Sequence, residues 1–435
     1  MAEKDADSAK SAAAHDVQAA RTAMVEALWN LDAVRTERVA EVFAKVDRHL
    51  FTPGTPLEDA YEATTAVRTK WDERGSAISS ISAPQIQAFM LEQADVRPGM
   101  RVLEVGSGGV NAAMLAELVG DTGSVTTADI DSEVSARTRD LLDSTGYTDV
   151  RVECADAEQG LPELGLVDII LVTVGCWDVP AALLHHLAPG GRMVIPLRAR
   201  GITRSLALER TDEHLTAASA ETCGFVKVQG IGEHQERMLL LLGDRIALRF
   251  DDDNGPDDPG LLDGVLAAKR CDVWTGVTVQ GRESFDSLPL WLATTLPGFG
   301  QLSVDPHYEP MTDGGPELAV PQGRWFPSAY VDAHGDSLAY LGTRRRDDGL
   351  FEFGAHAFGP HADTAAEGMV EQIRAWDRDH RDGPDPVIAV WPRETSDQEL
   401  SPPQDSTAEA VITKRHSHIT ISWPFQRSSR AGQVG

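Results

Sequence analysis

The chain has 435 residues, too many for one ordinary domain, and its hydrophobic content of 42% is ample for two or three packed cores. With 68 acidic and 39 basic residues its net charge is −29, which repels phosphate backbones and anionic lipids, so we expect no nucleic acid and no membrane as partner. Residues 1–20 lack the apolar core of a secretory signal, and no apolar run reaches membrane-spanning length. The four cysteines form no C-x-x-C pair. These features predict a cytoplasmic protein with no disulfide framework and no metal site.

The sequence of the N-terminal region predicts a helix followed by a segment that wraps around the rest of the protein. We expect a flexible lead over residues 1–20, because it is rich in Ala, Asp and Lys. Apolar residues then recur at helical spacing from Val17 to about Val46. The stretch Phe51–Ser82 contains Pro53-Gly54 and Pro56, so it should wrap around the protein rather than form a core element. Residues 21–82 are therefore predicted to be an N-terminal helical and wrapping segment.

Strands and helices then alternate. Strands are expected at Arg101–Val105, Ser124–Ala128, Val150–Glu153, Val167–Val174 and Arg192–Pro196. Helices are expected at Pro84–Ala94, Ala112–Val119, Glu133–Ser144 and Pro180–Leu187. This alternation is typical of a doubly wound α/β domain with a parallel sheet, predicted here for residues 83–248. Two further apolar segments, Ser205–Arg210 and Glu236–Leu242, could finish the sheet in antiparallel fashion.

An acidic stretch rich in Asp, Gly and Pro, Asp251–Pro259, predicts a linker over residues 249–260. After it, one amphipathic helix is expected at about Thr364–Trp376. Short alternating segments predict strands at Trp325–Val331, Ser337–Leu341, Leu350–Phe353, Val387–Trp391 and Val411–Trp423. Residues 261–435 are therefore predicted to form a C-terminal α+β domain. A role in peptide recognition is one hypothesis for this domain.

The strongest functional signal is Val102-Leu103-Glu104-Val105-Gly106-Ser107-Gly108-Gly109, a glycine-rich turn between a buried strand and a helix. Glycines let the backbone turn tightly and approach a ligand closely, but the pattern alone is shared by several nucleotide-type ligands. Three carboxylates accompany this turn. Glu104 lies within its strand, Asp129 ends the second strand, and Asp156 follows the third. Three carboxylates suit a cationic sulfonium and an ammonium group and suit a pyrophosphate poorly. The sequence therefore predicts a site for S-adenosylmethionine.

We expect each of these acids to take part in binding the cofactor, and helix capping is the structural alternative. Asp129 is placed to accept both ribose hydroxyls, Asp156 to reach an adenine amino group, and Glu104 to orient the amino end of the cofactor through the loop. Alternatively, Asp129 or Asp131 caps the helix that begins near Glu133. The remaining predicted cofactor-binding residues adjoin the same strand ends: Gly106, Ser107, Gly108, Gly109, Ile130, Ala157 and Thr173.

Several motifs that occur in order resemble the protein-L-isoaspartyl O-methyltransferases. They are Ile81-Ser82-Ala83-Pro84-Gln85-Ile86, Val102–Gly109, Gly146–Val150 and Leu187–Pro196, preceded by Val39–Pro53 and Ala60-Tyr61. The resemblance covers about residues 35–245. It implies a Rossmann-like class I methyltransferase fold and a carboxylate as methyl acceptor. It also implies that Ser82 lies beside the reacting carboxylate, where Ser79 or Ser80 in the same segment could assist it.

Ser82 has a structural alternative, since serine is a favoured N-cap and could cap the helix that starts at Pro84. The sequence also departs from the family's pattern. The Tyr-x-Asp-x-Pro segment of the family is Tyr61-Glu62-Ala63-Thr64-Thr65 here, and Val110 replaces the third loop glycine.

Together with the long C-terminal extension, these departures resemble a divergent subgroup associated with ribosomal-peptide biosynthesis, of lanthipeptide (FxLD), lasso-peptide or graspetide type. That resemblance implies methylation of an aspartate in a ring-containing precursor peptide, which leads to aspartimide or isoaspartate. The alternatives are an isoaspartyl repair methyltransferase with an extra domain, and a non-catalytic binding module with a methyltransferase fold. No sequence feature sets an oligomeric state.

Overall fold

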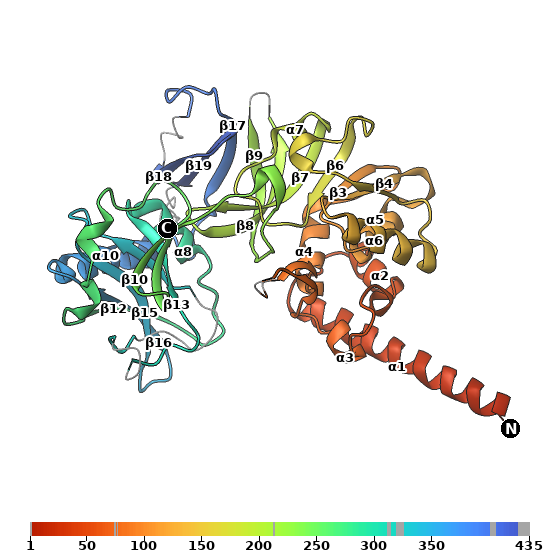
Figure 1. Ribbon diagram of the computed structural model, residues 1–435, viewed down its shortest axis with the longest axis horizontal. Helices are drawn as coiled ribbons and strands as arrows, with labels where there is room; N and C mark the ends of the chain where they lie inside the picture. Colours follow the sequence, from red (N-terminus) through yellow and green to blue (C-terminus); the bar gives the residue numbers. More distant parts are fainter. Residues whose placement is uncertain are drawn as a thin grey trace, which may run out of the picture. The chain divides into compact units, whose positions relative to one another are not determined.

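The structure is a computed structural model that describes residues 2–73, 75, 77–211, 214–310, 315–318, 326–400 and 406–424, with side chains from residue 14 onwards. The chain forms two compact units, one of residues 1–197 and 203–233 and the other of residues 198–202 and 234–435 (Figure 1). Among the described residues, no helix has the length and apolarity needed to cross a bilayer. The two units are described separately below.

The first unit is built on a doubly wound sheet with the strand order β5-β4-β3-β6-β7-β8-β9. Its strands are β3 (Arg101–Val105), β4 (Ser124–Asp129), β5 (Arg151–Cys154), β6 (Val167–Val172), β7 (Leu187–Ala199), β8 (Ile202–Arg210) and β9 (Leu215–Thr222). Strands β5, β4, β3, β6 and β7 are parallel to their neighbours, and β8 pairs with β9 in antiparallel fashion. Parallel strands are covered on both faces, which explains why all but one residue of β3 and of β6 are buried.

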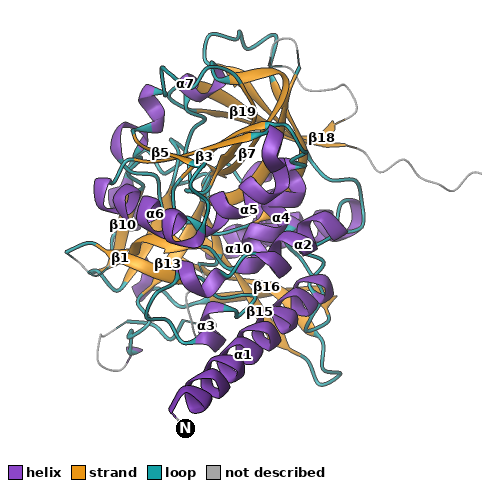
Figure 2. Cartoon of the chain, turned by 90° about the vertical axis from the view of Figure 1, so that its right-hand side faces the viewer, coloured by secondary structure: helices purple, strands orange, loops and turns teal. Residues whose placement is uncertain are grey.

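Helices connect these strands: α4 (Pro84–Ala94), α5 (Val110–Val119), α6 (Ser132–Thr145) and α7 (Ala181–Leu184). Helix α5 packs against β3 and β4, α6 against β4 and β5, and α4 against β6 (Figure 2, helices in purple). Pro84 begins α4, where a missing N–H costs nothing, and Gly146 ends α6 in a left-handed conformation. The expected α/β alternation is therefore present, and its parallel strands direct their carboxyl ends to one edge.

The N-terminal region is more regular than the sequence predicted. It forms α1 (Ala2–Asn30), α2 (Glu37–Lys45), α3 (Leu57–Ala60) and the antiparallel hairpin β1 (Val67–Trp71) with β2 (Ala77–Ile81). The predicted flexible lead is thus wrong, since α1 already begins at Ala2; alanine, which is abundant there, is the best helix former. The wrapping segment also contributes Phe51, Tyr61 and Ala63 to the core, all of them buried.

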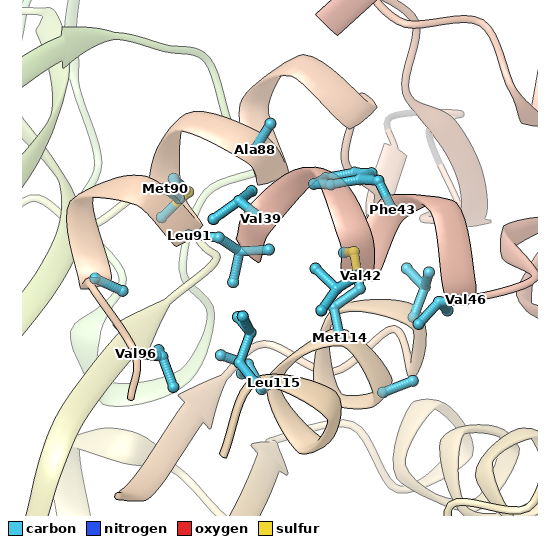
Figure 3. Close-up of a cluster of buried hydrophobic side chains, with 14 of the residues drawn as sticks. Val39, Val42, Phe43, Val46, Ala88, Met90, Leu91, Val96, Met114 and Leu115 are labelled. Atoms are coloured by element: carbon cyan, nitrogen blue, oxygen red, sulfur yellow. The ribbon is translucent and has the colours of Figure 1, made fainter. Parts of the chain in front are cut away.

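Helices α2, α4 and α5 share the hydrophobic core shown in Figure 3, to which they contribute Val39, Val42, Phe43, Val46, Ala88, Met90, Leu91, Met114 and Leu115. Burying a side chain of this size stabilises the fold by roughly 1.5–3 kcal/mol. Helix α2 begins at Thr36, whose side chain accepts the N–H of Val39. The carboxylate of Glu92 on α4 accepts the backbone N–H and the hydroxyl of Thr36. The N-terminal region is therefore an integral part of the first unit.

The second unit is an α+β structure with a seven-stranded antiparallel sheet in the order β10-β11-β13-β14-β15-β16-β12. Its strands are β10 (Arg237–Leu242), β11 (Ile246–Phe250), β12 (Cys271–Val279), β13 (Phe299–Val304), β14 (Ser328–Val331), β15 (Leu338–Arg345) and β16 (Phe351–Phe358). Helices α8 (Ser287–Thr295) and α10 (Ala362–Asp379) pack together, and α10 lies against β12, β15 and β16. Three further antiparallel strands are β17 (Val387–Pro392), β18 (Ser406–Thr413) and β19 (Ser417–Pro424).

Single turns of 3-10 helix complete both units. They are η1 (Arg48–Phe51), η2 (Gly120–Thr122), η3 (Ala157–Gln159), η4 (Gly230–Gly232), η5 (Pro259–Leu262) and η6 (Val265–Ala267).

The boundary between the units lies earlier than the predicted acidic linker. The second unit resumes at His234, and the segment Glu236–Leu242 contributes β10 (Arg237–Leu242) to its sheet instead of joining the first sheet. Of the expected linker residues, Asp251 is buried and Asp252 has a side chain that is only 6% exposed; they pair with Arg198 and Lys414 at 2.8 and 2.6 Å. Buried acids are tolerated because they are paired, and their charge alone had suggested solvent exposure.

The last predicted strand, Val411–Trp423, is instead the hairpin of β18 and β19 with a turn at Lys414–His416. Alternating apolar residues continue through both arms of a hairpin, so the pattern did not reveal the turn. Trp325, at the start of another predicted strand, lies outside the described residues.

Candidate active site

A pocket lies in the first unit at the carboxyl ends of β3, β4 and β6, with β2 and the chain at residues 226–229 as its other walls. It encloses about 1000 Å³, its open mouth included. Such an edge is where open parallel sheets bind their ligands. The pocket is lined by Ile78–Ser82, Gln87, Met90, Glu104–Gly108, Val110, Asn111, Ala128–Asp131, Val134, Ala155–Ala157, Thr173, Val174 and Val226–Gln229.

The glycine loop after β3 has the close contacts that only glycine permits. Gly106 has φ +94°, and a Cβ there would lie 2.6 Å from Oγ1 of Thr173. The Thr173 hydroxyl donates to the carbonyl of Gly106 at 2.8 Å. Gly109 has φ +84°, and a Cβ there would lie 2.8 Å from the ring of Phe51. The position of the third expected glycine, Val110, is the buried first residue of α5, where a left-handed conformation is not needed.

Asp129, at the end of β4, holds the glycine loop. Its Oδ2 accepts the backbone N–H of Ser107 and its Oδ1 that of Asp131, both at 2.9 Å. Burial raises the pKa of Asp129 and the two backbone donors oppose that shift. The helix-capping role belongs to Asp131, whose Oδ1 accepts the N–H groups of Glu133 and Val134 at 2.9 and 3.2 Å. The carboxylate of Asp129 therefore lies in the pocket wall and not at the start of α6.

Glu104 is 1% exposed and lies beneath the loop. Its carboxylate accepts from Nδ2 of Asn111 at 2.9 Å and from Oγ1 of Thr127 at 2.6 Å, and Thr127 also contacts Oγ of Ser107 at 3.1 Å. Burial raises the pKa of Glu104 to about 7, while the hydrogen bonds from Thr127 and Asn111 oppose the shift. A cation bound in the pocket would favour the charged form of this buried acid.

Asp156 follows β5 and precedes η3. Its Oδ1 accepts the N–H of Glu158 at 2.9 Å, and its Oδ2 accepts the N–H of Ile231 at 3.2 Å. Asp156 thus joins the strand end to the chain that crosses the pocket after β9. That chain is anchored to the segment after β6, because Gly175 and residues Val226 and Val228 exchange backbone hydrogen bonds of 2.8 and 3.0 Å.

The opposite end of the pocket is formed by serines of β2 and the chain after it. Ser79, Ser80 and Ser82 all line the pocket, and the hydroxyl of Ser79 also bonds that of Thr69 on β1 at 2.9 Å. The alternative role of Ser82 as a helix cap is wrong: the N-cap of α4 is Ala83, and no side chain caps it. Because α4 starts at Pro84, its N-cap position is Ala83, one residue after Ser82, and the Ser82 side chain is not the helix cap.

Arg48 supports this serine segment from behind. It is 2% exposed and donates Nη2 to the carbonyl of Ser82 and Nε to the carbonyl of Ala60, both at 2.7 Å. Its Nη1 donates to Oε1 of Gln87, which also lines the pocket. Burial lowers the pKa of Arg48 to about 10, so the guanidinium stays charged at neutral pH. Sequence reasoning placed Arg48 within a matching motif but gave it no role.

The structure gathers almost all the predicted site residues around this one pocket. Those that line it are Ser80, Ser82, Glu104, Gly106, Ser107, Gly108, Asp129, Ile130, Asp156, Ala157 and Thr173. Gly109 is not among the lining residues and instead packs against Phe51. Sequence reasoning missed Gln87, Asn111 and Val226–Gln229. Asn111 could have been found from its place as the second residue of the helix after the glycine loop, whereas residues 226–229 reach the pocket only through the tertiary fold.

Two histidines outside the pocket serve structure. Nε2 of His186 accepts the N–H of Leu161, and Nδ1 of the same ring lies 3.0 Å from the carbonyl of Gly165. His418 is buried on β19, with Nε2 3.0 Å from the carbonyl of Arg393. Both histidines are therefore engaged in holding turns together.

The pocket fits S-adenosylmethionine in its chemistry. Its wall carries the carboxylates of Glu104, Asp129 and Asp156, and the glycine backbone allows close approach along the loop. Acidic groups are the complement of a sulfonium and an ammonium and would repel a pyrophosphate.

The fold and the site define a class I S-adenosylmethionine-dependent methyltransferase. The family model described as protein-L-isoaspartate(D-aspartate) O-methyltransferase (PCMT) matches residues 19–232. A protein-L-isoaspartate O-methyltransferase of Methanopyrus kandleri is 40% identical over 220 residues, which are 50% of this chain and 94% of that protein. This chain belongs to the protein-L-isoaspartate O-methyltransferase family.

Other similar proteins have the same name. The protein-L-isoaspartate O-methyltransferase of Pyrococcus horikoshii is 36% identical over 215 residues, which are 48% of this chain and 92% of that protein. A solved protein-L-isoaspartate O-methyltransferase aligns with a TM-score of 0.47 and 18% identity over 85% of this chain and 96% of its own. A putative one from Plasmodium falciparum, in complex with S-adenosyl-L-homocysteine, aligns with a TM-score of 0.41 and 18% identity over 48% of this chain and 97% of its own.

The chain is accordingly an S-adenosylmethionine-dependent carboxyl O-methyltransferase and not a binding module.

Proposed function

We propose that this enzyme methylates the side-chain carboxylate of an aspartate in a ring-containing precursor peptide. The observation that carries the proposal is the contrast within one pocket. The cofactor end keeps the loop glycines Gly106 and Gly108 and three carboxylates, whereas the family's Tyr-x-Asp-x-Pro segment is Tyr61-Glu62-Ala63-Thr64-Thr65 near the acceptor end. The carbonyl of Ala63 accepts the N–H of Gln85 at 2.9 Å, so this altered segment adjoins the start of α4 and Ser82.

The roles of the site residues follow from their positions. Bound S-adenosylmethionine supplies the methyl group. Asp129 accepts the ribose hydroxyls with the lone pairs that its two backbone donors leave, Asp156 reaches the adenine amino group, and Glu104 holds the loop that positions the amino end. The loop residues Gly106–Gly109 and the neighbours Ile130, Ala157 and Thr173 shape the wall around the cofactor.

Little acid–base help is needed at the acceptor, because an aspartate with an ordinary pKa near 4 is already ionised at neutral pH. The task of the enzyme is to align the carboxylate oxygen with the methyl group and to exclude water. The uncharged hydroxyls of Ser82 and Ser80 can orient a carboxylate without neutralising it. Arg48 positions Ser82 by donating to its carbonyl at 2.7 Å.

The methyl ester is a better electrophile than the carboxylate. The backbone nitrogen of the residue after the aspartate can attack the ester carbonyl, lose its proton and expel methanol. The new C–N bond closes an aspartimide, which water can open to isoaspartate. A flexible following residue such as glycine assists this ring closure, and no further enzyme group is required.

The recognition of the constrained precursor is assigned in this proposal to the α+β unit. The family model ends at residue 232, so the whole of residues 234–435 is additional to the matched region. An added unit of this size is expected to serve a substrate that compact relatives do not bind. A ring-containing peptide with a photoreactive group, mixed with the full chain, should label residues in 234–435, while a linear isoaspartyl peptide with the same group should not. Labelling confined to the first unit with both peptides would contradict this assignment.

Repair of isoaspartyl residues is the second candidate. It is favoured by the identity of 40% to a relative of that name over 94% of the relative's length. In that case the acceptor is an isoaspartyl carboxylate in a damaged protein, and the second unit has another purpose. The cofactor chemistry is the same in both candidates.

One experiment separates the two. The full chain is incubated with S-adenosylmethionine labelled on the methyl group and with three peptides of one sequence: linear aspartyl, linear isoaspartyl, and aspartyl closed into a ring by a side-chain bridge. Faster labelling of the ring peptide, followed by methanol release, is the result expected here. Faster labelling of the linear isoaspartyl peptide would establish the repair candidate instead.

A further inference from the structure

Two histidines and one aspartate from separate loops meet in the second unit, far from the methyl-transfer chemistry in sequence. Asp332 and His334 lie in the turn between β14 and β15, and His361 immediately precedes α10. One ligand atom from each of the three residues lies within 4.8 Å of the others. The imidazole rings of His334 and His361 are stacked, with centroids 4.2 Å apart and an angle of 21° between their planes.

Asp332 gives the cluster a feature that a chance surface group would not have. It is 7% exposed, and its Oδ1 accepts the N–H of Ser337 at 3.1 Å. Its Oδ2 is also buried, yet among the described residues none donates a hydrogen bond to it. A buried carboxylate oxygen without a partner is costly, and a cation in front of it would remove that cost.

His361 is oriented in a way that leaves one nitrogen for a ligand. Its Nδ1 lies 2.9 Å from Oδ1 of Asp336, an interaction that fixes the ring and directs Nε2 away from that carboxylate. Metal-binding histidines usually have such a carboxylate on the nitrogen that does not bind the metal, and it makes the imidazole a better ligand. His334 is exposed, so its ring can move to complete the site.

The two loops are held together before any ion is added. The backbone N–H of His361 donates to Oγ of Ser337 at 2.7 Å. Gly359 has φ +119°, and a Cβ there would lie 2.5 Å from the same Oγ, so the chain before α10 can approach the turn only because this residue is glycine. The donors are therefore preorganised by contacts that do not themselves need the metal.

We infer that Asp332, His334 and His361 bind a first-row divalent transition-metal ion such as Zn²⁺. Imidazole nitrogen with one carboxylate is a typical donor set for zinc and its neighbours, whereas Mg²⁺ and Ca²⁺ prefer oxygen ligands throughout. Ligand bonds of roughly 2.0–2.2 Å require the donors to move closer together than their present spacing, which rotation of His334 allows. The ion links the β14–β15 turn to the start of α10 and leaves coordination positions for water.

The test uses the full chain after treatment with a chelator that removes bound metal. The protein is titrated with ZnCl₂ in a calorimeter. Excess Mg²⁺ is present so that carboxylates on the acidic surface are already occupied. The expected result is one tight site per chain that also takes up Co²⁺ with visible ligand-field absorption. His361→Ala and Asp332→Asn should each weaken this site by roughly 10- to 100-fold or more, as the loss of metal-site groups does. The matched control is His307→Ala, which removes another exposed histidine of the same unit, next to Asp305.

The outcomes are distinguishable from folding defects and from the methyltransferase proposal. The near-ultraviolet circular dichroism of the buried tryptophans Trp376 and Trp423 reports whether the second unit is folded in each variant. Equal zinc affinity in the wild type, His361→Ala and Asp332→Asn would overturn the inference, as would an equal loss of the tight site in His307→Ala. Cofactor binding is measured separately, since the pocket in the first unit shares none of these residues.

Discussion

At the cofactor end of the pocket, Asp129 and Asp156 each accept two backbone N–H groups, whereas at the acceptor end Ser82 is held through its carbonyl by the side chain of Arg48. Backbone donors are present whatever the neighbouring side chains are, so the cofactor end depends on the course of the chain. The acceptor end depends on a few side chains. Substrate preference can therefore change in this pocket while cofactor binding is retained, as the altered segment Tyr61–Thr65 suggests for this chain.

The strongest test of the cofactor end is Asp129→Ala. It removes a carboxylate placed to accept the ribose hydroxyls, and it leaves the N–H groups of Ser107 and Asp131 without their acceptor. Charge-assisted hydrogen bonds of this kind are worth about 3–4 kcal/mol as a pair, so binding of S-adenosylmethionine should weaken roughly 100- to 1,000-fold. Calorimetric titration measures this, with Asp140→Ala on the exposed side of α6 as control. Unchanged affinity in Asp129→Ala would remove Asp129 from the cofactor site.

Arg48→Met tests the support of the acceptor end. The substitution keeps an apolar stem but leaves the carbonyls of Ser82 and Ala60 without their buried donor, at about 1–3 kcal/mol for each unsatisfied group. We expect kcat to fall at least tenfold and the dissociation constant of S-adenosylmethionine to change little, since the cofactor end does not depend on Arg48. Arg38→Met, which breaks a surface ion pair with Asp95, is the control for losing an arginine. An equal effect of Arg48→Met on cofactor binding and on kcat would mean that the two ends are not independent.

Glu104→Gln tests the buried carboxylate by its pH dependence. The folded protein binds a proton on Glu104 up to a pKa of about 7, above the unfolded value of 4.5, so its ionisation destabilises the fold as the pH rises through this window. Between pH 5.5 and 8 the free energy of unfolding of the cofactor-free wild type should fall by about 2 kcal/mol relative to Glu104→Gln. Urea unfolding at the two pH values measures the difference. A constant difference between the two proteins would show that Glu104 does not titrate in this range.

Ser82→Ala is expected to have the smallest effect. A hydrogen bond from a hydroxyl to an ionised carboxylate is worth about 1.5 kcal/mol at the low end of its range, so kcat/KM for the peptide should fall roughly 10-fold with cofactor affinity unchanged. The control is Ser144→Ala, because Ser144 is exposed on α6, donates its hydroxyl to the carbonyl of Leu141 and does not line the pocket. Equal activity of Ser82→Ala and the wild type would move the acceptor contact to another residue, with Ser80 the next to change.

Sequence alone predicted the parallel strands and their helices closely; β3 and α4, for example, have the predicted bounds. These elements are marked by local patterns, and the carboxyl ends of parallel strands always meet at one edge, so Glu104, Asp129 and Asp156 could be assigned to one site. The same local patterns could not decide whether Asp129 or Asp131 caps α6. Both acids are near the start of α6, and only the path of the glycine loop brings Ser107 to Asp129.

The errors and omissions concern contacts between distant residues. The acidic stretch at Asp251 and Asp252 was interpreted as a linker because its charges suggested solvent, but Arg198 and Lys414 neutralise them in the fold. The chain at residues 226–229 has no local signal for a pocket wall.

Sequence by itself determined the methyltransferase class of this protein, because the glycine loop and the acids at successive strand ends form a local, periodic pattern. Tertiary structure alone decided which side chains face each other across loops: Arg48 behind Ser82, and Asp332 and His334 against His361. The expectation of no metal site came from the spacing of the cysteines along the chain. A site assembled from two loops leaves no such spacing, since its ligands are brought together by β-sheet pairing and by the close approach at Gly359.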